Sequence, residues 1–235
     1  MFSTLRFILT HPLSSKRPLS ALWRYGRWQM ESRLTNEVEF SWVDGSKLIA
    51  RNGMTGATGN IYCGLHEFTE MAFLLHFLHP NELFVDAGAN IGSYTILSSA
   101  VCRAHTLAIE PDPASIQALS RNIEANNLQE RVDVRQVALG AREGRILFTV
   151  DKDTMNRAAT SSDSCTQEVA LQSLDSMLKN LAPVLIKMDV EGYEAEVIQG
   201  AQETLRRPSL LALQLETVDA SVRECLKCHG FEEAH

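Results

Sequence analysis

The sequence predicts an α/β protein built on a mostly parallel central sheet. Short aliphatic segments alternate with segments of helical periodicity over most of the chain, which is typical of parallel strands joined by helices. The first strand of this alternation runs into a glycine-rich turn, Asp86-Ala-Gly-Ala-Asn-Ile-Gly92. The chain has 235 residues, of which 45% are hydrophobic and 22% charged. It is therefore long enough to bury such a sheet.

Residues 1–36 are expected to form a basic helical arm. Residues 1–30 contain five Lys or Arg side chains and no Asp or Glu, although the whole chain has a net charge of −7. The preferred interpretation is an arm whose aromatic residues pack on the domain, because it needs no partner. The alternatives are a membrane-surface helix anchored by Trp23, Tyr25 and Trp28, or a mitochondrial transit peptide.

Residues 37–80 are expected to form a small hairpin and a lead-in helix. Apolar residues alternate from Val38 to Ala50 around Asp44-Gly45, a dipeptide that tolerates a tight turn. Glu67 to Leu78 has a helical apolar pattern, and the following His79-Pro80 ends it.

Residues 81–235 are expected to form the main domain. The predicted strands are Leu83–Ala87, Thr106–Glu110, Val132–Val137, Val184–Asp189 and Leu210–Glu216. The predicted helices are Ser93–Val101, Pro113–Asn126 and Glu194–Leu205. Two extra strands, Arg145–Val150 and Glu168–Leu171, flank a polar segment, Asp151–Thr166, which is expected as a loop on the rim of the sheet.

Composition excludes several classes of protein. The net charge of −7 disfavours binding to phosphate backbones, so nucleic acid is not expected as a partner. No apolar stretch is long enough to cross a bilayer. The five cysteines are an odd number, and no secretory signal is evident at the start of the chain. We therefore expect a cytoplasmic protein with reduced thiols, with peripheral membrane contact through the arm as the alternative.

Acidic residues follow two strands where a ligand would bind, at the carboxyl ends of a parallel sheet. The turn after the first strand has G-x-x-x-G with Asp86 ahead of it, which indicates a cationic ligand rather than a pyrophosphate. S-adenosylmethionine combines adenosine with a positive charge. Glu110 ends the second strand, 22 residues after Gly88, at the usual distance for a ribose-binding acid.

A second acidic turn follows the strand that contains Lys187. Asp189 ends this strand, Glu191 lies in the turn, and Glu194 opens the next helix. Helix capping is sufficient to explain Glu194. The other two acids are candidates for chemistry.

Several ordered blocks of residues together resemble a known family. They are Phe84-Val-Asp-Ala-Gly-Ala-Asn-Ile-Gly-Ser-Tyr-Thr95, Glu110-Pro111, Ala138-Leu139-Gly140, Ser173-Leu174-Asp175, Ile186-Lys-Met-Asp-Val-Glu-Gly-Tyr-Glu194 and Gly200-Ala201. Over about residues 38–231 the sequence resembles the FkbM family of S-adenosylmethionine-dependent methyltransferases. The resemblance implies a class I Rossmann-like fold with helices on both faces of the sheet, and methylation of a hydroxyl on a sugar, glycan or natural product.

The resemblance also implies positions for the cofactor. Asp86, Gly88, Asn90 and Gly92 would line its methionine end, Glu110 would hold the ribose, Val137 or Ala138 would border adenine, and Asp189 would lie beside the donor methyl group. One departure concerns the C-terminal β-hairpin of this fold, which is shortened or absent because the chain stops at His235. The sheet then ends early, or an N-terminal strand or a second subunit in a homodimer covers its edge.

Methyl transfer to a hydroxyl requires a group that accepts the hydroxyl proton. The candidates are Asp189, Glu191, Glu216 and His66, and Asp189 is the first choice because it ends a central strand. We expect no metal, although the three carboxylates offer an alternative site for Mg²⁺. The haem-like pattern Cys225-Leu-Lys-Cys228-His229 lies on a helical segment and is taken as coincidental.

Two other functions remain as alternatives, a nicotinamide-dependent oxidoreductase and a non-catalytic nucleotide-binding module. The missing third glycine and Asp86 argue against the first. The presence of the glycine turn, Glu110 and the second acidic turn together argues against the second.

Overall fold

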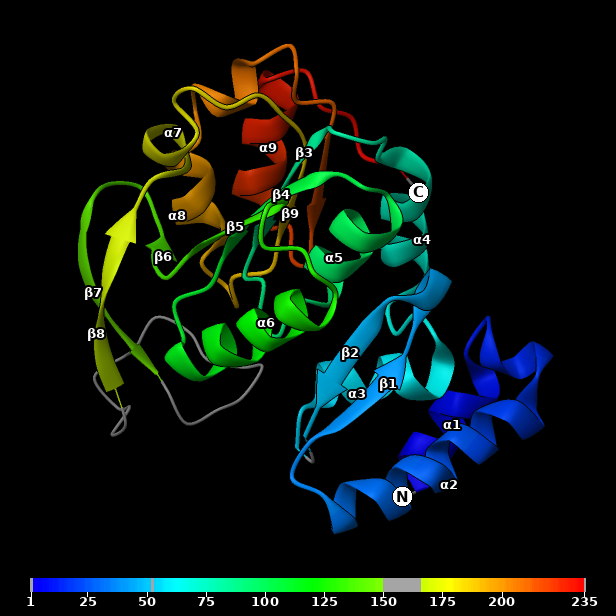
Figure 1. Cartoon of the computed structure of the whole chain (residues 1–235). Coiled ribbons are helices and arrows are strands. Elements are labelled where there is room, and N and C mark those ends of the chain that lie inside the picture. The colour runs from blue at the N-terminus through cyan, green and yellow to red at the C-terminus, as the bar shows by residue number, and fades with distance from the viewer. Residues whose placement is uncertain (1, 52, 150–165, 235) are drawn as a thin grey trace.

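The structure, a computed structural model, describes residues 2–51, 53–149 and 166–234 and contains a parallel central sheet (Figure 1). Within these ranges the sheet has five strands in the order β10-β9-β3-β4-β5. The strands are β3 Leu83–Ala87, β4 His105–Ile109, β5 Val132–Arg135, β9 Pro183–Met188 and β10 Ala212–Leu215. All four pairings are parallel, which confirms the predicted sheet. The predicted rim loop, Asp151–Thr166, lies outside the described residues except for Thr166.

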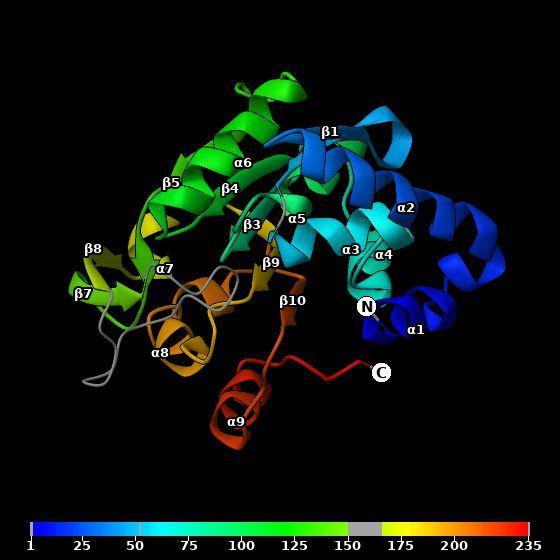
Figure 2. The ribbon, with the colours of Figure 1, turned by 90° about the horizontal axis from the view of Figure 1, so that it is seen from below.

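Helices cover both faces of this sheet, as the resemblance implied (Figure 2). One layer contains α4 Phe68–Phe77, α5 Ser93–Ile96 with its π-helical continuation Leu97–Val101, and α6 Pro113–Ala125. The other contains α7 Leu174–Met177, α8 Glu194–Gln199 and α9 Ala220–Cys228. Successive residues of a strand face opposite sides. Phe84 accordingly packs with α4 and α5, whereas Val85 and Ala87 pack with α8 and α9.

The helix predicted over Glu194–Leu205 is shorter in the structure, where α8 spans Glu194–Gln199. A Cβ on the next residue, Gly200, would lie 2.2 Å from the carbonyl oxygen of Gly140. A separate 3₁₀ turn, Thr204–Arg206, follows. Its start is fixed by Asp175, whose carboxylate accepts hydrogen bonds from the backbone N–H groups of Glu203 and Thr204.

A second, three-stranded sheet lies beside the first. It consists of β6 Ala138–Leu139, β7 Gly144–Thr149 and β8 Thr166–Gln172 in the order β6-β8-β7. β7 and β8 are antiparallel. They match the two extra strands expected from the sequence, except that Val150 at the end of the first lies outside the described residues. β5 ends at Arg135, short of the predicted Val137, and β6 pairs with β8 instead of β4.

The N-terminal region packs on the α5 and α6 side of the molecule (Figures 1 and 2). It contains α1 Phe2–Thr10, the 3₁₀ turn Ser14–Lys16, α2 Pro18–Leu34, β1 Val38–Ser41, the 3₁₀ turn Val43–Gly45, β2 Lys47–Ala50 and α3 Thr55–Cys63. The predicted hairpin is present. Ile8, Ala21 and Trp28 are buried in one cluster with Ile91 and Ala118 of the main domain. The arm therefore shares a hydrophobic core with the rest of the chain. The burial of Trp28 agrees with the interpretation in which the aromatic residues of the arm pack on the domain.

Two asparagines one helical turn apart join β2 to α6. Asn122 Oδ1 accepts a hydrogen bond from Ile49 N (2.6 Å), and Asn126 Oδ1 accepts one from Lys47 N (2.8 Å). Asn126 Nδ2 also donates to the Lys47 carbonyl. These bonds satisfy backbone groups on the free edge of a two-stranded sheet.

The far edge of the main sheet is formed by β10. Among the described residues β10 pairs only with β9, so a closing hairpin is absent there. The alternative in which an N-terminal strand covers this edge is wrong, because β1 and β2 pair with each other. The Gln214 side chain on β10 instead donates to the Glu70 carbonyl of α4. No helix in the described ranges is both long and apolar enough to cross a membrane.

Candidate active site

A cavity opens at the carboxyl ends of β3, β4 and β9. Its lining includes seven of the residues singled out from the sequence: Gly88, Asn90, Glu110, Val137, Ala138, Asp189 and Glu191. Residues that sequence reasoning did not select as site residues also line it, among them Ile146 and Phe148 from β7 and Tyr193 before α8. The β7 residues carried no recognisable signal, because their place depends on how the second sheet packs. The lining thus combines carboxylates that follow β4 and β9 with apolar residues, several of them from β6 and β7.

The glycine turn after β3 contacts the turn after β9 directly. Gly88 has φ +81°, and a Cβ there would lie 1.8 Å from the carbonyl oxygen of Asp189. Only glycine fits this contact and this conformation. Gly92, at φ +94°, is the N-cap of α5 and lies against Leu119 of α6. It does not line the cavity, so its role in the structure is to pack the helix.

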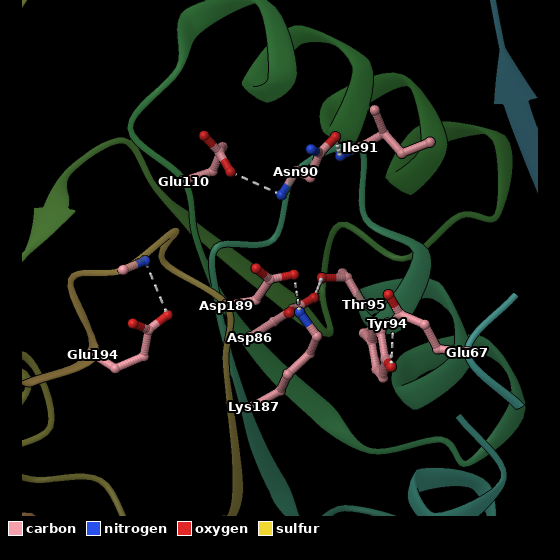
Figure 3. A network of polar contacts seen from close by, with 11 residues as sticks. Glu67, Asp86, Asn90, Ile91, Tyr94, Thr95, Glu110, Lys187, Asp189 and Glu194 are labelled. Carbon is pink, nitrogen blue, oxygen red and sulfur yellow. Dashed lines mark hydrogen bonds and ion pairs between the residues drawn. The ribbon is translucent and has the colours of Figure 1, made fainter. Parts of the chain in front are cut away.

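Glu110 is held by the backbone of both neighbouring turns. Its carboxylate accepts hydrogen bonds from Asn90 N (2.8 Å) and Asp112 N (2.9 Å), and only 7% of the residue is exposed (Figure 3). Burial raises its pKa to about 7. Each carboxylate oxygen has a further lone pair, so Glu110 retains acceptor capacity toward the cavity.

Asp86 lies behind the cavity and not in its lining. It is buried on the α5 side of the sheet, where its Oδ2 accepts a hydrogen bond from Thr95 Oγ1 (2.6 Å). The other oxygen, Oδ1, has no hydrogen-bond partner among the described residues. Burial raises the pKa of this carboxyl group. The structure therefore separates Asp86 from the cavity, although it was expected to line the cofactor site.

A neighbour of Asp86 is Lys187, a buried residue that sequence reasoning did not select (Figure 3). Its Nζ lies 2.9 Å from Asp189 Oδ2 and 4.7 Å from the ring centroid of Tyr94. Tyr94 in turn donates a hydrogen bond to Glu67 Oε2 (2.6 Å). The nearby charges of Asp189 and Asp86 outweigh burial and raise the pKa of Lys187. The sequence did contain a signal that could have identified Lys187, namely a lysine inside the apolar run Leu185–Met188. A lysine buried in such a strand requires counter-charges nearby.

Three carboxylates meet at the ends of β9 and β10. Asp189, Glu191 and Glu216 each offer an oxygen, and these atoms lie within 4.8 Å of one another. Burial alone would raise the pKa of Asp189, but Lys187 and a hydrogen bond with Glu216 lower it overall. That hydrogen bond and the charge of Asp189 raise the pKa of Glu216 to about 7. Of the two groups, Glu216 is therefore the one that binds a proton first on acidification, and its pKa lies near neutral pH.

His66 and Glu194, two other residues discussed from the sequence, contact neighbouring parts of the protein and do not line the cavity. The His66 ring packs against Phe7 of α1, with centroids 5.3 Å apart, and against Gly59 of α3. The structure does not bring it to the cavity, and burial lowers its pKa. Glu194 is the first residue of α8, and its Oε1 accepts a hydrogen bond from Gly192 N (3.3 Å), which lies before the helix.

Comparison with known proteins gives related sequences. Methyltransferase sdnD of Sordaria araneosa is 27% identical over 172 residues, which cover 58% of this chain and 66% of the relative. Hexuronic acid methyltransferase AglP of Haloferax volcanii is 24% identical over 145 residues, covering 60% and 59%. The chain thus spans about three fifths of the length of such relatives. Precorrin 8w decarboxylase of Methanobacterium thermoautotrophicum aligns in structure over 72% of this chain and 73% of its own, with 14% identity and a TM-score of 0.45.

The strongest comparison is with a protein family. The sequence matches the methyltransferase FkbM domain over residues 86–232, more than half of the chain. This match includes the glycine turn, Glu110 and the carboxylates at the ends of β9 and β10. It confirms both the predicted class I methyltransferase fold and the predicted cofactor, S-adenosylmethionine. The chain belongs to the FkbM methyltransferase family.

Proposed function

We propose that the protein is an S-adenosylmethionine-dependent O-methyltransferase that acts on a hydroxyl of a sugar, glycan or natural product. The observation that carries this proposal is the position of Asp189, which lines the cavity and has a carboxylate oxygen of Glu216 within 4.8 Å of its own. The pKa of Glu216 is raised to about 7, so this pair can accept a proton near neutral pH. A hydroxyl is a very weak acid, so its methylation benefits from a nearby proton acceptor. The relative named as a hexuronic acid methyltransferase supports a sugar acceptor.

The lining residues fit the cofactor. Glu110 offers a buried carboxylate for the two ribose hydroxyls, and Val137, Ala138 and Phe148 form an apolar wall for adenine. The acidic side of the cavity, at Asp189, suits a cationic amine and sulfonium. The bound cofactor would supply an activated methyl group, and the protein would orient the acceptor and remove its proton.

The proton is proposed to pass to the Asp189–Glu216 pair. Lys187 keeps Asp189 ionised, and Glu216 takes up or releases the shared proton at an accessible position. Glu191 lies beside the pair, and its charge favours the protonated form of Glu216. Asp86 and Tyr94 hold Lys187 from behind and act as positioning residues.

The remaining expectations stay predictions. We propose the division into an arm (1–36), a hairpin and lead-in helix (37–80) and a cofactor-binding core (81–235). A homodimer formed along the free edge of β10, and a cytoplasmic location with peripheral membrane contact, are proposals of the same kind. Calorimetric titration with S-adenosylmethionine and with NAD tests the proposed activity against its oxidoreductase alternative. Tighter binding of NAD would contradict the proposal.

Glu110→Ala should weaken S-adenosylmethionine binding by about 1–3 kcal/mol, because ribose hydroxyls would be buried without their acceptor. Isothermal titration calorimetry measures this loss directly. The matched control is Glu130→Ala, since Glu130 is exposed. An unchanged affinity in Glu110→Ala would remove this carboxylate from the cofactor site.

The pH profile should show the titration of Glu216. Below its pKa of about 7 Glu216 already holds a proton, and Asp189, whose pKa is lowered, is a poor acceptor for a second one. We expect kcat/KM to rise by about tenfold per pH unit below this pKa and to level off above it. In Glu216→Gln the inflection should disappear, whereas the exposed control Glu224→Gln should keep it. An identical profile in Glu216→Gln would show that another group accepts the proton.

A further inference from the structure

The outward face of α2 carries an apolar stripe that is exposed to solvent. Its four members are Leu19, Trp23, Met30 and Leu34, with exposed fractions of 82%, 64%, 61% and 78%. At 3.6 residues per turn these four positions fall within an arc of about 60° on the helix. We refer to them as the α2 stripe.

The α2 stripe is separate from the face through which α2 packs on the protein. Trp28 and Ala21 lie on the opposite side of the helix and are buried against α3 and the main domain. A surface helix of a globular protein normally has one apolar face and one polar face. α2 has two apolar faces, and only the inner one is covered by the described residues.

Positive charges border the α2 stripe. Arg27 and Arg33 are exposed on its two sides, and Lys16 and Arg17 are exposed at its N-terminal end. The one acid of α2, Glu31, is paired with Arg27 at 2.7 Å. Arg24 is excluded from this border, because it donates hydrogen bonds inward to the carbonyl oxygens of Ile61 and Tyr62. This local excess of positive charge contrasts with the net charge of −7 for the whole chain.

α2 lies at the outer edge of the molecule, away from the carboxyl ends of the central strands (Figures 1 and 2). None of the described residues that line the cavity precedes Gly88. A surface that contacted the α2 stripe would therefore leave the lining of the cavity unaltered.

We propose that the α2 stripe docks on the surface of an anionic lipid bilayer. Leu, Trp and Met side chains flanked by arginines match the boundary between acyl chains and negatively charged headgroups. A second copy of the chain fits less well, because stacking two stripes would bring Arg27 and Arg33 of both copies together without added acids. The sequence alone suggested Trp23, Tyr25 and Trp28 as anchors, but Trp28 is buried and Tyr25 is half-buried. This inference gives the peripheral membrane contact proposed above a specific surface, and it does not depend on the proposed methyl transfer.

Cosedimentation of the full chain with lipid vesicles tests the proposal. The wild type should bind vesicles that contain phosphatidylglycerol, bind phosphatidylcholine vesicles much less, and lose affinity as salt is added. Replacing Leu19, Trp23 and Leu34 by Gln should lower the partition coefficient at least tenfold. Arg27→Gln and Arg33→Gln should each lower it by about fivefold.

The matched control replaces Leu181 and Leu211, which are exposed elsewhere, by Gln. It should bind vesicles like the wild type, and calorimetry with S-adenosylmethionine should show that every variant keeps its cofactor site. Equal binding by the triple variant and the control would overturn the proposal, as would an absence of wild-type binding. A dimer in analytical ultracentrifugation that the triple variant abolishes, without vesicle binding, would assign the stripe to contact between copies.

Discussion

Asp189→Asn is expected to lower kcat by about 10²- to 10⁴-fold, the range that a positioned proton acceptor contributes. The amide has nearly the same size, and its oxygen can still accept a hydrogen bond from Lys187 Nζ, which lies 2.9 Å from Asp189 Oδ2 in the wild type. The variant should therefore fold, but it can neither share a proton with Glu216 nor accept one. Single-turnover kinetics with the physiological acceptor measure the effect.

The outcomes of this experiment separate three mechanisms. Asp133→Asn is the control, because Asp133 is exposed on β5 and far from the proton pair in sequence and sheet order. Full activity of Asp189→Asn together with an inactive Glu216→Gln would make Glu216 the sole base. If EDTA abolished wild-type activity and Mg²⁺ restored it, the three carboxylates would be metal ligands instead.

Lys187→Met is expected to lower the free energy of unfolding at pH 7.5 by about 3–5 kcal/mol, the cost of leaving a buried ion pair without one partner. Asp86, which is buried, and Asp189, whose side chain is 30% exposed, would then lack their cation. Urea denaturation measures the loss. Lys179→Met is the control, since Lys179 is exposed.

The loss of unfolding free energy in Lys187→Met should become smaller as the pH is lowered. Without the lysine, the pKa values of Asp86 and Asp189 in the folded state rise above their unfolded values. A raised carboxyl pKa favours the folded state at low pH, and this contribution is lost as pH rises through the folded pKa. The deficit should thus be smaller at pH 5.5 than at pH 7.5. A deficit that stayed constant or grew on acidification would show that packing, not charge, is the cause.

The central sheet could be predicted because its strands are short aliphatic runs that end in turn residues. The positions of Gly88 and Glu110 could also be predicted from their residue types and their spacing, and both line the cavity. α3 could not be predicted, because Thr55-Gly-Ala-Thr-Gly59 has poor helix propensity. This helix is stabilised by packing against the arm and His66, contacts that local sequence does not encode.

The orientation of several polar residues was harder to predict than their position. Asp86 was expected at the cofactor, yet it shares a face of β3 with Phe84 and points into the layer that contains α5. The period of two along a strand carried this information. Lys187 was passed over as a strand residue, because its importance depends on Asp86, Asp189 and Tyr94 converging from separate elements.

The contact between Gly88 and the Asp189 carbonyl has a mechanical consequence. Backbone meets backbone there with no intervening side chain, so the segment proposed to receive the cofactor and the segment proposed to accept the proton cannot shift independently. Displacement of one turn would then move the other, and the main-chain part of the distance between the proposed cofactor site and the proposed base would stay constant. Adaptation to new acceptors would accordingly fall to the walls of the cavity, while this junction stays fixed.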